Sequence, residues 1–91
     1  MDKVKKLLEK HNFEIYNSPL GFIWSKNNMD NTSIVCSFNR GVMTVSISHG
    51  GVRNPRKAKK VIKSIFGALY RCEQAKTPSA SAVHFNLTRL N

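Results

Sequence analysis

The side chains best suited to chemistry in this sequence are cations that crowd one short stretch. Six of them occur within eleven residues, namely Arg53, Arg56, Lys57, Lys59, Lys60 and Lys63. No acidic residue lies between Asp30 and Glu73 to neutralise them. Lysine and arginine at this density hold phosphate groups by charge and hydrogen bonding, without reading sequence. The stretch therefore predicts a nucleic-acid-binding surface, with a merely solvated helix face as the alternative.

Acid–base or nucleophilic catalysis has much less support. The three histidines, His11, His49 and His84, lie far apart in the sequence. His49 is the best candidate for a catalytic base because it stands at the expected end of a strand, beside the basic stretch. A histidine before two glycines, here Gly50 and Gly51, is nevertheless more often a turn residue. The acids show no paired spacing and no glycine-rich phosphate loop occurs, so we expect no enzyme and no cofactor.

Composition limits the possible partners, metal sites and cellular location. The chain has 91 residues and a net charge of +10, an excess that favours polyanions as partners, either nucleic acid (RNA or DNA) or an anionic membrane. Its two cysteines, Cys36 and Cys72, form no CxxC pair, so we expect no metal site and no disulfide, as in a reducing cytoplasm. The charged N-terminus is unlike a signal peptide, and no apolar run approaches the ~18 residues of a membrane span. We therefore expect no contact with a membrane.

A helix is predicted to carry the basic stretch. Asn54 is a suitable N-cap, and Pro55 fits the first helical position, where no amide donor is needed. Apolar residues recur at helical spacing and form one stripe: Ala58, Val61, Ile62, Ile65, Phe66 and Leu69. At about 100° per residue, the cations fall on the opposite side. We expect this helix to run towards Tyr70, with its apolar face on a core and its cationic face towards a partner.

The chain before this helix reads as a first helix, over residues 2–11, followed by strands. Strands are predicted at 13–16, 22–26, 33–38 and 43–48, separated by polar or glycine-containing turns. Two further cations, Arg40 at a hairpin tip and Lys26 near a strand end, are expected to extend the nucleic-acid footprint. The predicted fold class is α+β, α-β-β-β(-β)-α, with an antiparallel meander packed on two helices.

After Tyr70 the apolar pattern weakens. We expect a single domain over residues 1–72, followed over residues 73–91 by a polar linker and an additional strand or tail. Val83, Phe85 and Leu87 alternate with polar residues, which predicts a strand at a sheet edge or one lent to a second copy of the chain. A frayed tail is the alternative. A homo-oligomer formed through this strand is therefore one expectation.

Aromatic side chains stack on nucleic-acid bases when they lie on an open sheet face. The candidates are Trp24, Tyr16, Phe22 and Tyr70. Because the chain has so few aromatic residues, we expect most of these four to be needed in the core.

The order helix, strands, helix, with a lysine-rich start to the second helix, resembles the double-stranded-RNA-binding domain. In that family a KKxxK-like cluster at this place meets phosphates, and Arg56, Lys57, Lys59 and Lys60 stand in the matching positions. The chain is also similar to the small HicA-like toxins, which cleave mRNA. VKKLLEKHNFEI looks like their first helix and following strand, and VSISHGGVRNPRKAKKVIKSI like their last strand, His-Gly turn and closing helix. Those toxins carry a catalytic histidine early in the sheet, whereas the matching stretch SPLGF has none.

These observations favour a non-enzymatic RNA-binding protein that grips phosphates. The alternative is a small inhibitor or antitoxin-like protein, of the kind that phages encode, which binds a toxin or nuclease together with RNA. A third hypothesis is a HicA-like mRNA ribonuclease with His49 as a displaced base. Binding to a membrane surface is disfavoured, because the apolar stripe of the helix is needed for the core.

Overall fold

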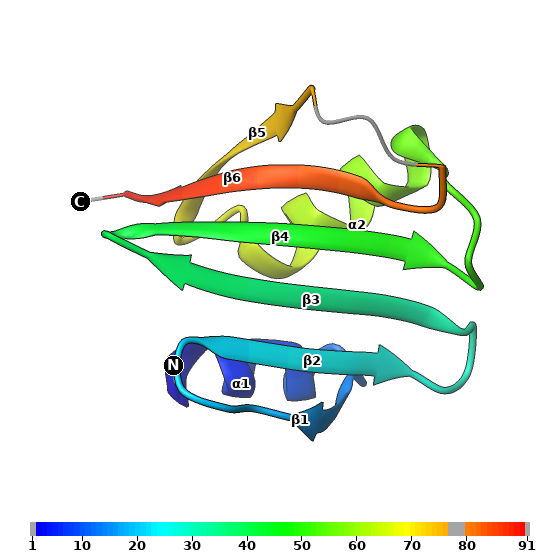
Figure 1. The fold of residues 1–91 in the computed structure, drawn as a ribbon, viewed down its shortest axis with the longest axis horizontal. Helices are drawn as coiled ribbons and strands as arrows, with labels where there is room; N and C mark the ends of the chain where they lie inside the picture. Colours follow the sequence, from blue (N-terminus) through cyan, green and yellow to red (C-terminus); the bar gives the residue numbers. More distant parts are fainter. Residues whose placement is uncertain (1, 77–79, 91) are drawn as a thin grey trace.

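A computed structural model describes residues 2–76 and 80–90 of the chain. The elements follow one another in the order (Figure 1) α1 (Asp2–Lys10), β1 (Glu14–Asn17), β2 (Phe22–Asn27), β3 (Thr32–Asn39), β4 (Val42–His49), α2 (Pro55–Phe66), β5 (Tyr70–Ala75) and β6 (Val83–Arg89). Two helices and one six-stranded antiparallel sheet confirm the predicted α+β class. The first four strands form the expected meander.

The sheet has the strand order β1-β2-β3-β4-β6-β5. The β3–β4 hairpin turns through Arg40 and Gly41, which have φ angles of 49° and 80°. Positive φ at both positions suits a type I′ turn, whose twist matches that of the strands. A second tight reversal follows β4 at Gly50 and Gly51, where the flanking residues exchange backbone hydrogen bonds of 3.1 and 3.2 Å. This reversal leads the chain from β4 towards α2.

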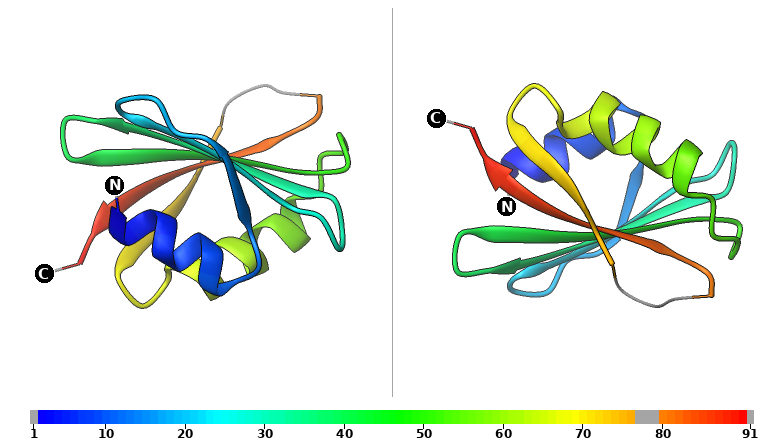
Figure 2. Two further views of the ribbon diagram at one scale, coloured as in Figure 1. Left: turned by 90° about the horizontal axis from the view of Figure 1, so that it is seen from below. Right: turned by 90° about the horizontal axis from the view of Figure 1, so that it is seen from above.

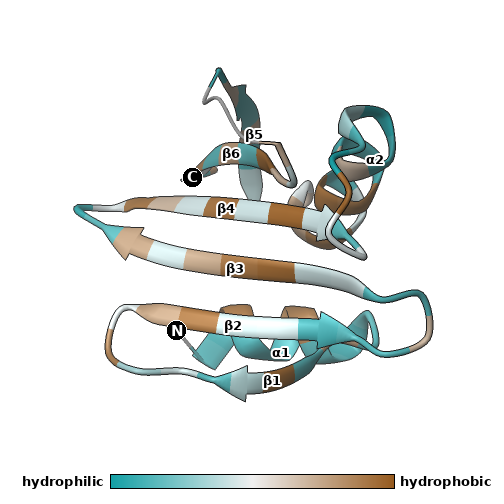
Figure 3. Cartoon of the chain, turned by 45° about the vertical axis from the view of Figure 1, so that its right-hand side comes forward, coloured by the Kyte–Doolittle hydropathy of each residue, from teal (hydrophilic) through white to brown (hydrophobic). Residues whose placement is uncertain are grey.

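Both helices cover one face of the sheet, and the other face is open (Figure 2). Side chains alternate between the two faces along each strand. Figure 3 shows this alternation as apolar and polar bands along β3 and β4. The buried apolar strand residues on the helix side are Ile23, Ile34, Cys36, Met43, Val45, Ile47, Val83, Phe85 and Leu87. The helices complete this core with Val4, Leu8, Ala58, Ile62, Ile65 and Phe66.

Helix α2 is shorter than predicted. It ends at Phe66, and Gly67 is its C-cap, with a backbone N–H that donates to the Lys63 carbonyl over 2.9 Å. Glycine is a poor helix residue, which favours an end here although Leu69 continues the apolar stripe in sequence. Tyr70 already belongs to β5, where its ring meets Phe66 edge-on at a centroid distance of 5.9 Å. The prediction that the helix runs towards Tyr70 is therefore wrong.

The C-terminal strands require the largest correction. β5 runs to Ala75, so residues 73–75, where a linker was expected to begin, are part of the sheet. β6 lies between β4 and β5 and pairs with both, so it is neither an edge strand nor a tail. Val83, Phe85 and Leu87 are at most 2% exposed, which makes β6 integral to the core. Paired on both sides, β6 has no free edge to lend to a second copy. The part of the expected linker at residues 77–79 lies outside the described residues.

Most of the four aromatic residues considered for stacking lie outside the core, contrary to the prediction. Trp24 is 51% exposed and Tyr16 is 56% exposed. Phe22 is half-buried and points to the same side of β2 as Trp24. Only Tyr70 packs against the core. The open face of the sheet therefore carries exposed aromatic surface.

Candidate nucleic-acid interface

The beginning of α2 is fixed by its cap. Asn54 Oδ1 accepts a hydrogen bond from the Lys57 backbone N–H over 3.2 Å, and Pro55 occupies the first turn. The cap satisfies one free amide of the first turn, and proline has none to satisfy. Burial of the apolar stripe then turns the cations outward. All of the helical cations are exposed, as is the one just before the helix: Arg53, Arg56, Lys57, Lys59, Lys60 and Lys63.

These cations form no ion pair within residues 2–76 and 80–90, although Lys57 lies close enough to Asp30 to lower the pKa of its carboxyl group. The ion pair found there joins Arg71 and Glu73 on β5, 2.8 Å apart. The first turn of α2 also contains no acidic residue. The positive end of a helix dipole favours acids and disfavours cations, so Arg56 and Lys57 stand where they cost stability. Such a placement argues that they serve a ligand.

Helix α1 adds lysines to the same layer of the molecule. Lys3, Lys6 and Lys10 are exposed on this helix. Because α1 and α2 cover the same face of the sheet (Figure 2), their cations share one side of the protein. Asp2 and Glu9 offset part of the charge on α1. The cationic face of α2 (Arg56, Lys57, Lys59, Lys60 and Lys63) is therefore the stronger site.

The opposite face of the sheet is balanced in charge. Lys26 lies there, because Ser25 before it is fully buried on the helix side. Lys26 stands directly across from Glu14 in the β1–β2 register. Arg71 and Glu73, which also point to this face, form the ion pair on β5. Lys26 therefore does not extend the cationic face of α2 as expected.

Arg40 also lies apart from α2. It sits in the turn before β4, whereas α2 follows the other end of that strand (Figure 1). With Tyr70 and Arg89, Arg40 lines a second cavity of about 250 Å³. The structure thus keeps the predicted cations of residues 53–63 on one segment and places Arg40 and Lys26 elsewhere.

His49 is held inside the fold rather than presented to a substrate. Its Nδ1 lies 3.0 Å from Oγ1 of Thr32, a residue that is only 1% exposed. Its Nε2 is buried and has no hydrogen-bond partner in the described part of the chain. Burial lowers the pKa of His49, Lys57 lowers it further, and Asp30 opposes the change. A general base must reach the proton it abstracts, so this geometry favours a positioning role over catalysis.

Thr32 connects His49 to Asp30. The Thr32 backbone N–H donates to Asp30 Oδ1 over 3.1 Å, and its side chain also hydrogen-bonds this carboxylate. Burial by itself would raise the pKa of Asp30, but the hydrogen bonds from Thr32 and the charge of Lys57 lower it overall. Asp30 is therefore an ionised acceptor whose direction is fixed by its neighbours.

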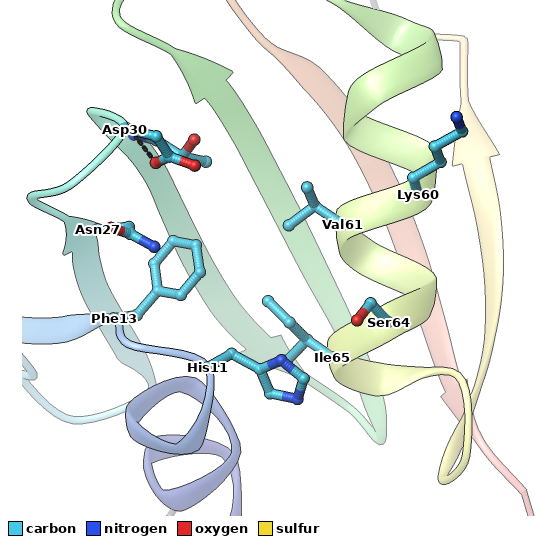
Figure 4. Close-up of a pocket in the computed structure, with 9 residues that line it drawn as sticks. His11, Phe13, Asn27, Asp30, Lys60, Val61, Ser64 and Ile65 are labelled. Atoms are coloured by element: carbon cyan, nitrogen blue, oxygen red, sulfur yellow. Dashed lines mark hydrogen bonds between the residues drawn. The ribbon is translucent and has the colours of Figure 1, made fainter.

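A groove opens beside Asp30, between α2, the turn after α1 and the β2–β3 turn (Figure 4). Its volume is about 350 Å³. Phe13, Val61 and Ile65 supply its apolar lining, and the polar lining comes from His11, Asn27, Asp30, Thr32, Lys60 and Ser64. Lys60 joins the groove to the cationic face of α2. Sequence reasoning missed this site because its members come from distant segments and show no shared local pattern.

A second polar pair that the sequence did not reveal lies on the open face. Ser46 Oγ and His84 Nδ1 are 2.7 Å apart, on directly paired residues of β4 and β6. Serine beside histidine is the geometry of an activated nucleophile. Neither residue lines the groove or the second cavity, however, and the acid on neighbouring β5, Glu73, is engaged by Arg71. The pair is therefore a cross-strand contact.

No group of three or more His, Cys, Asp or Glu side chains within residues 2–76 and 80–90 could hold a metal ion. Nor does any helix in this part of the chain combine the length and the apolar character needed to cross a bilayer. Both cysteines are free, and burial raises the pKa of the Cys36 thiol to about 12. Cys36 is a core residue, as predicted.

Comparison with known proteins finds no matching family model, no matching curated protein and no matching solved structure. The resemblances to RNA-binding domains and toxins therefore stay predictions, and function has to be inferred from geometry and charge.

Proposed function

We propose that this protein is a non-enzymatic RNA-binding protein that holds phosphate groups on the cationic face of α2. One observation carries the proposal: the helix exposes five cations that form no ion pair within the described residues, at positions that include its own positive end. Phosphates are the ligands that suit cations and free amides at a helix N-terminus. The lysines of α1 lie on the same side and lengthen the surface along the RNA backbone.

RNA is proposed over DNA because of the sequence resemblance to RNA-binding domains; phosphate contacts alone do not separate the two. The cytoplasm is the proposed location, since both cysteines are free and a reducing compartment keeps them so. Binding of this kind releases counterions, and its affinity should therefore fall steeply as salt rises.

The test measures anisotropy of a labelled single-stranded RNA across a salt series. Replacing Lys59 and Lys63 with glutamine should weaken binding about tenfold at about 0.1 M salt, and should flatten the slope of log affinity against log salt by about 0.7 per lost phosphate contact. Both side chains are exposed and neither lines the groove. Glutamine and lysine have similar helix propensities, so the unfolding temperature should fall only slightly, through loss of the favourable Lys63 charge in the last turn.

The matched control removes the same charge elsewhere. Lys26→Gln combined with Arg40→Gln lowers the net charge equally, at residues that lie away from α2. This control should keep the wild-type salt slope. Equal weakening by both double variants would mean that net charge, rather than the cationic face of α2, governs binding, and the proposal would fail.

The open face favours a second function. Trp24 and Tyr16 are more than half exposed there, on a face whose charges are balanced. Exposed aromatic surface without net charge is typical of the centre of protein interfaces. A protein partner such as a toxin or nuclease would cover Trp24 while RNA occupies α2, which is the arrangement of an antitoxin-like inhibitor.

A further inference from the structure

Neighbouring backbone groups set the hydrogen-bonding roles of two polar side chains in the groove, Asn27 and Asp30. Asn27 Oδ1 accepts from the Met29 backbone N–H over 2.9 Å, which settles the orientation of the amide. Its Nδ2 is then left as a donor on the groove side of the residue, towards Phe13 (Figure 4). Asp30 supplies the complementary acceptor, and Thr32 holds its carboxylate in place. The groove thus offers one aimed donor beside one aimed carboxylate.

Flat and apolar surfaces surround these groups. Phe13 and Ile65 are each 5% exposed and form part of the lining, together with Val61. The His11 ring lies at the other end of the groove, next to Ile65 (Figure 4). A volume of about 350 Å³ falls at the small end of the range for ligand pockets, which suits one small planar group.

We propose that the groove binds the base of one unpaired guanosine in the RNA that α2 holds; this inference rests on the proposed RNA-binding function. The pairing edge of guanine presents the acceptor O6 beside two donors, N1–H and N2–H. Asn27 Nδ2 donates to O6, and the Asp30 carboxylate accepts from both N–H groups. Bases of unpaired nucleotides are commonly read on this edge while their faces pack on side-chain rings.

The other bases fit this arrangement less well. Uracil has only one N–H on the same edge. The Asp30 carboxylate would therefore lack the second hydrogen bond that guanine donates. Adenine and cytosine place an unprotonated ring nitrogen next to their amino group, and its lone pair would face the Asp30 carboxylate. Unpaired polar groups of this kind are what allow a site to reject the wrong base.

The charges around the groove favour a nucleotide over a protein side chain. Asp30 alone would also suit an arginine or lysine from a partner. Lys60 lines the groove, however, and Lys57 lies close enough to influence Asp30 and His49 electrostatically. A cationic side chain beside Asp30 would be repelled by Lys57, and by Lys60 at longer range because the Lys60 ammonium group points away from Asp30 (Figure 4), whereas a neutral base that carries an anionic phosphate is attracted.

The experiment uses the full chain and two labelled RNAs, an eight-nucleotide oligoadenylate and the same oligomer with one internal guanosine. Wild-type protein should bind the guanosine oligomer about tenfold more tightly at moderate salt. Asp30→Asn keeps the side-chain size and an oxygen for the Thr32 backbone N–H, but removes the carboxylate. This variant should lose the preference, while its affinity for oligoadenylate stays the same or rises because a negative charge has gone.

Glu9→Gln is the charge-matched control, since Glu9 is exposed on α1 and does not line the groove. It should keep the preference for guanosine. A second variant, Asn27→Asp, retains the oxygen that accepts from Met29 but loses the donor, and it should also lose the preference.

The outcomes separate this inference from the function on which it rests. Equal, salt-dependent binding of both oligomers by wild-type protein, or a preference that survives in Asp30→Asn, overturns the guanosine site and leaves phosphate binding by α2 intact. Absence of binding to either oligomer at low salt overturns the RNA-binding function itself. A preference that disappears in Asp30→Asn and Asn27→Asp but persists in Glu9→Gln supports the site.

Discussion

A buried imidazole nitrogen without an acceptor makes protonation costly at His49. When Nδ1–H donates to Thr32 Oγ1, Nε2 carries only a lone pair, and little is lost by burying it. Protonation would add a buried N–H with nothing to receive it, which costs free energy. The neutral ring is therefore the stable form, and it supports Thr32 as Thr32 supports Asp30.

This arrangement predicts a pH dependence of stability. Burial, together with Lys57, lowers the pKa of His49 in the folded protein. Below about pH 6.5 the unfolded chain then binds this proton more readily than the folded one, so the free energy of unfolding should fall as pH drops from 7 to 5. Urea unfolding of His49→Gln should show a smaller fall over the same interval. An equal fall in the variant and the wild type would contradict the role given to this histidine.

At the scale of residues, sequence reasoning succeeds where one element decides the outcome. The exposure of Lys59 and Lys63 follows from helical periodicity alone. The roles of Asp30 and Asn27 do not, because they depend on partners in other segments or on the shape of a turn. A polar turn in sequence gives no sign of which oxygen accepts and which nitrogen stays free.

The cations at the N-terminus of helix α2 lower the stability of the fold, because the positive end of the helix dipole disfavours them. Arg56→Glu should remove an unfavourable interaction with the helix dipole and add a favourable one, for a gain of about 1 kcal/mol in unfolding free energy. For a domain of this size, thermal unfolding should then shift upward by about 5 °C. The same change should weaken RNA binding. Differential scanning calorimetry and the anisotropy assay measure the two effects.

The other end of α2 provides the control for this prediction. Lys63 lies in the last turn, where the negative end of the dipole favours a cation. Lys63→Glu therefore makes the same kind of charge reversal but should lower the unfolding temperature, while it also weakens RNA binding. If both reversals move stability in the same direction, the dipole does not explain the cost of the N-terminal cations.

At the scale of elements, local sequence signals located the start of helix α2 better than its end. The start of α2 was predictable because Asn54 and Pro55 act within one turn. Its end was not, because Leu69 prolongs the apolar stripe past Gly67. β5 and the place of β6 were missed for a different reason: β6 inserts beside β4, a partner distant in sequence, and no local pattern encodes that pairing.

The whole molecule separates its charges by face. Cations crowd the helical side, whereas the open face combines exposed aromatic residues with charges of opposite sign as neighbours. The net charge of +10 was plain from the sequence. The concentration of most of this excess on the helical side was not, because it depends on both helices packing on the same face of the sheet. The two faces can therefore serve different partners.

Trp24, the single tryptophan, reports on the open face. RNA that binds the cationic face of α2 should leave its emission maximum and its quenching by acrylamide unchanged. A protein partner on the open face should shift the emission to shorter wavelength. A marked change of Trp24 emission on addition of RNA alone would place the RNA on the wrong side of the sheet for the proposed function.

Moving the tryptophan to α2 allows the same measurement to be made on the helical side. Ser64→Trp in a Trp24→Phe background puts the probe at the groove on α2, where Ser64 is exposed. RNA should change the emission of this variant. If RNA binding is seen by anisotropy but the emission of neither Trp24 nor the Ser64→Trp probe changes, the helical side is not the binding surface.

The insertion of β6 between β4 and β5 also constrains how the protein is made. Chains leave the ribosome from the N-terminus, and α2 emerges well before residues 83–89. Until those residues arrive, β4 keeps one edge unpaired, and the part of the core that β6 fills stays open. An unpaired strand edge beside apolar surface invites association with other chains. A chain truncated after α2 would therefore expose this edge and would tend to associate with other chains, and the arrival of β6 closes the sheet.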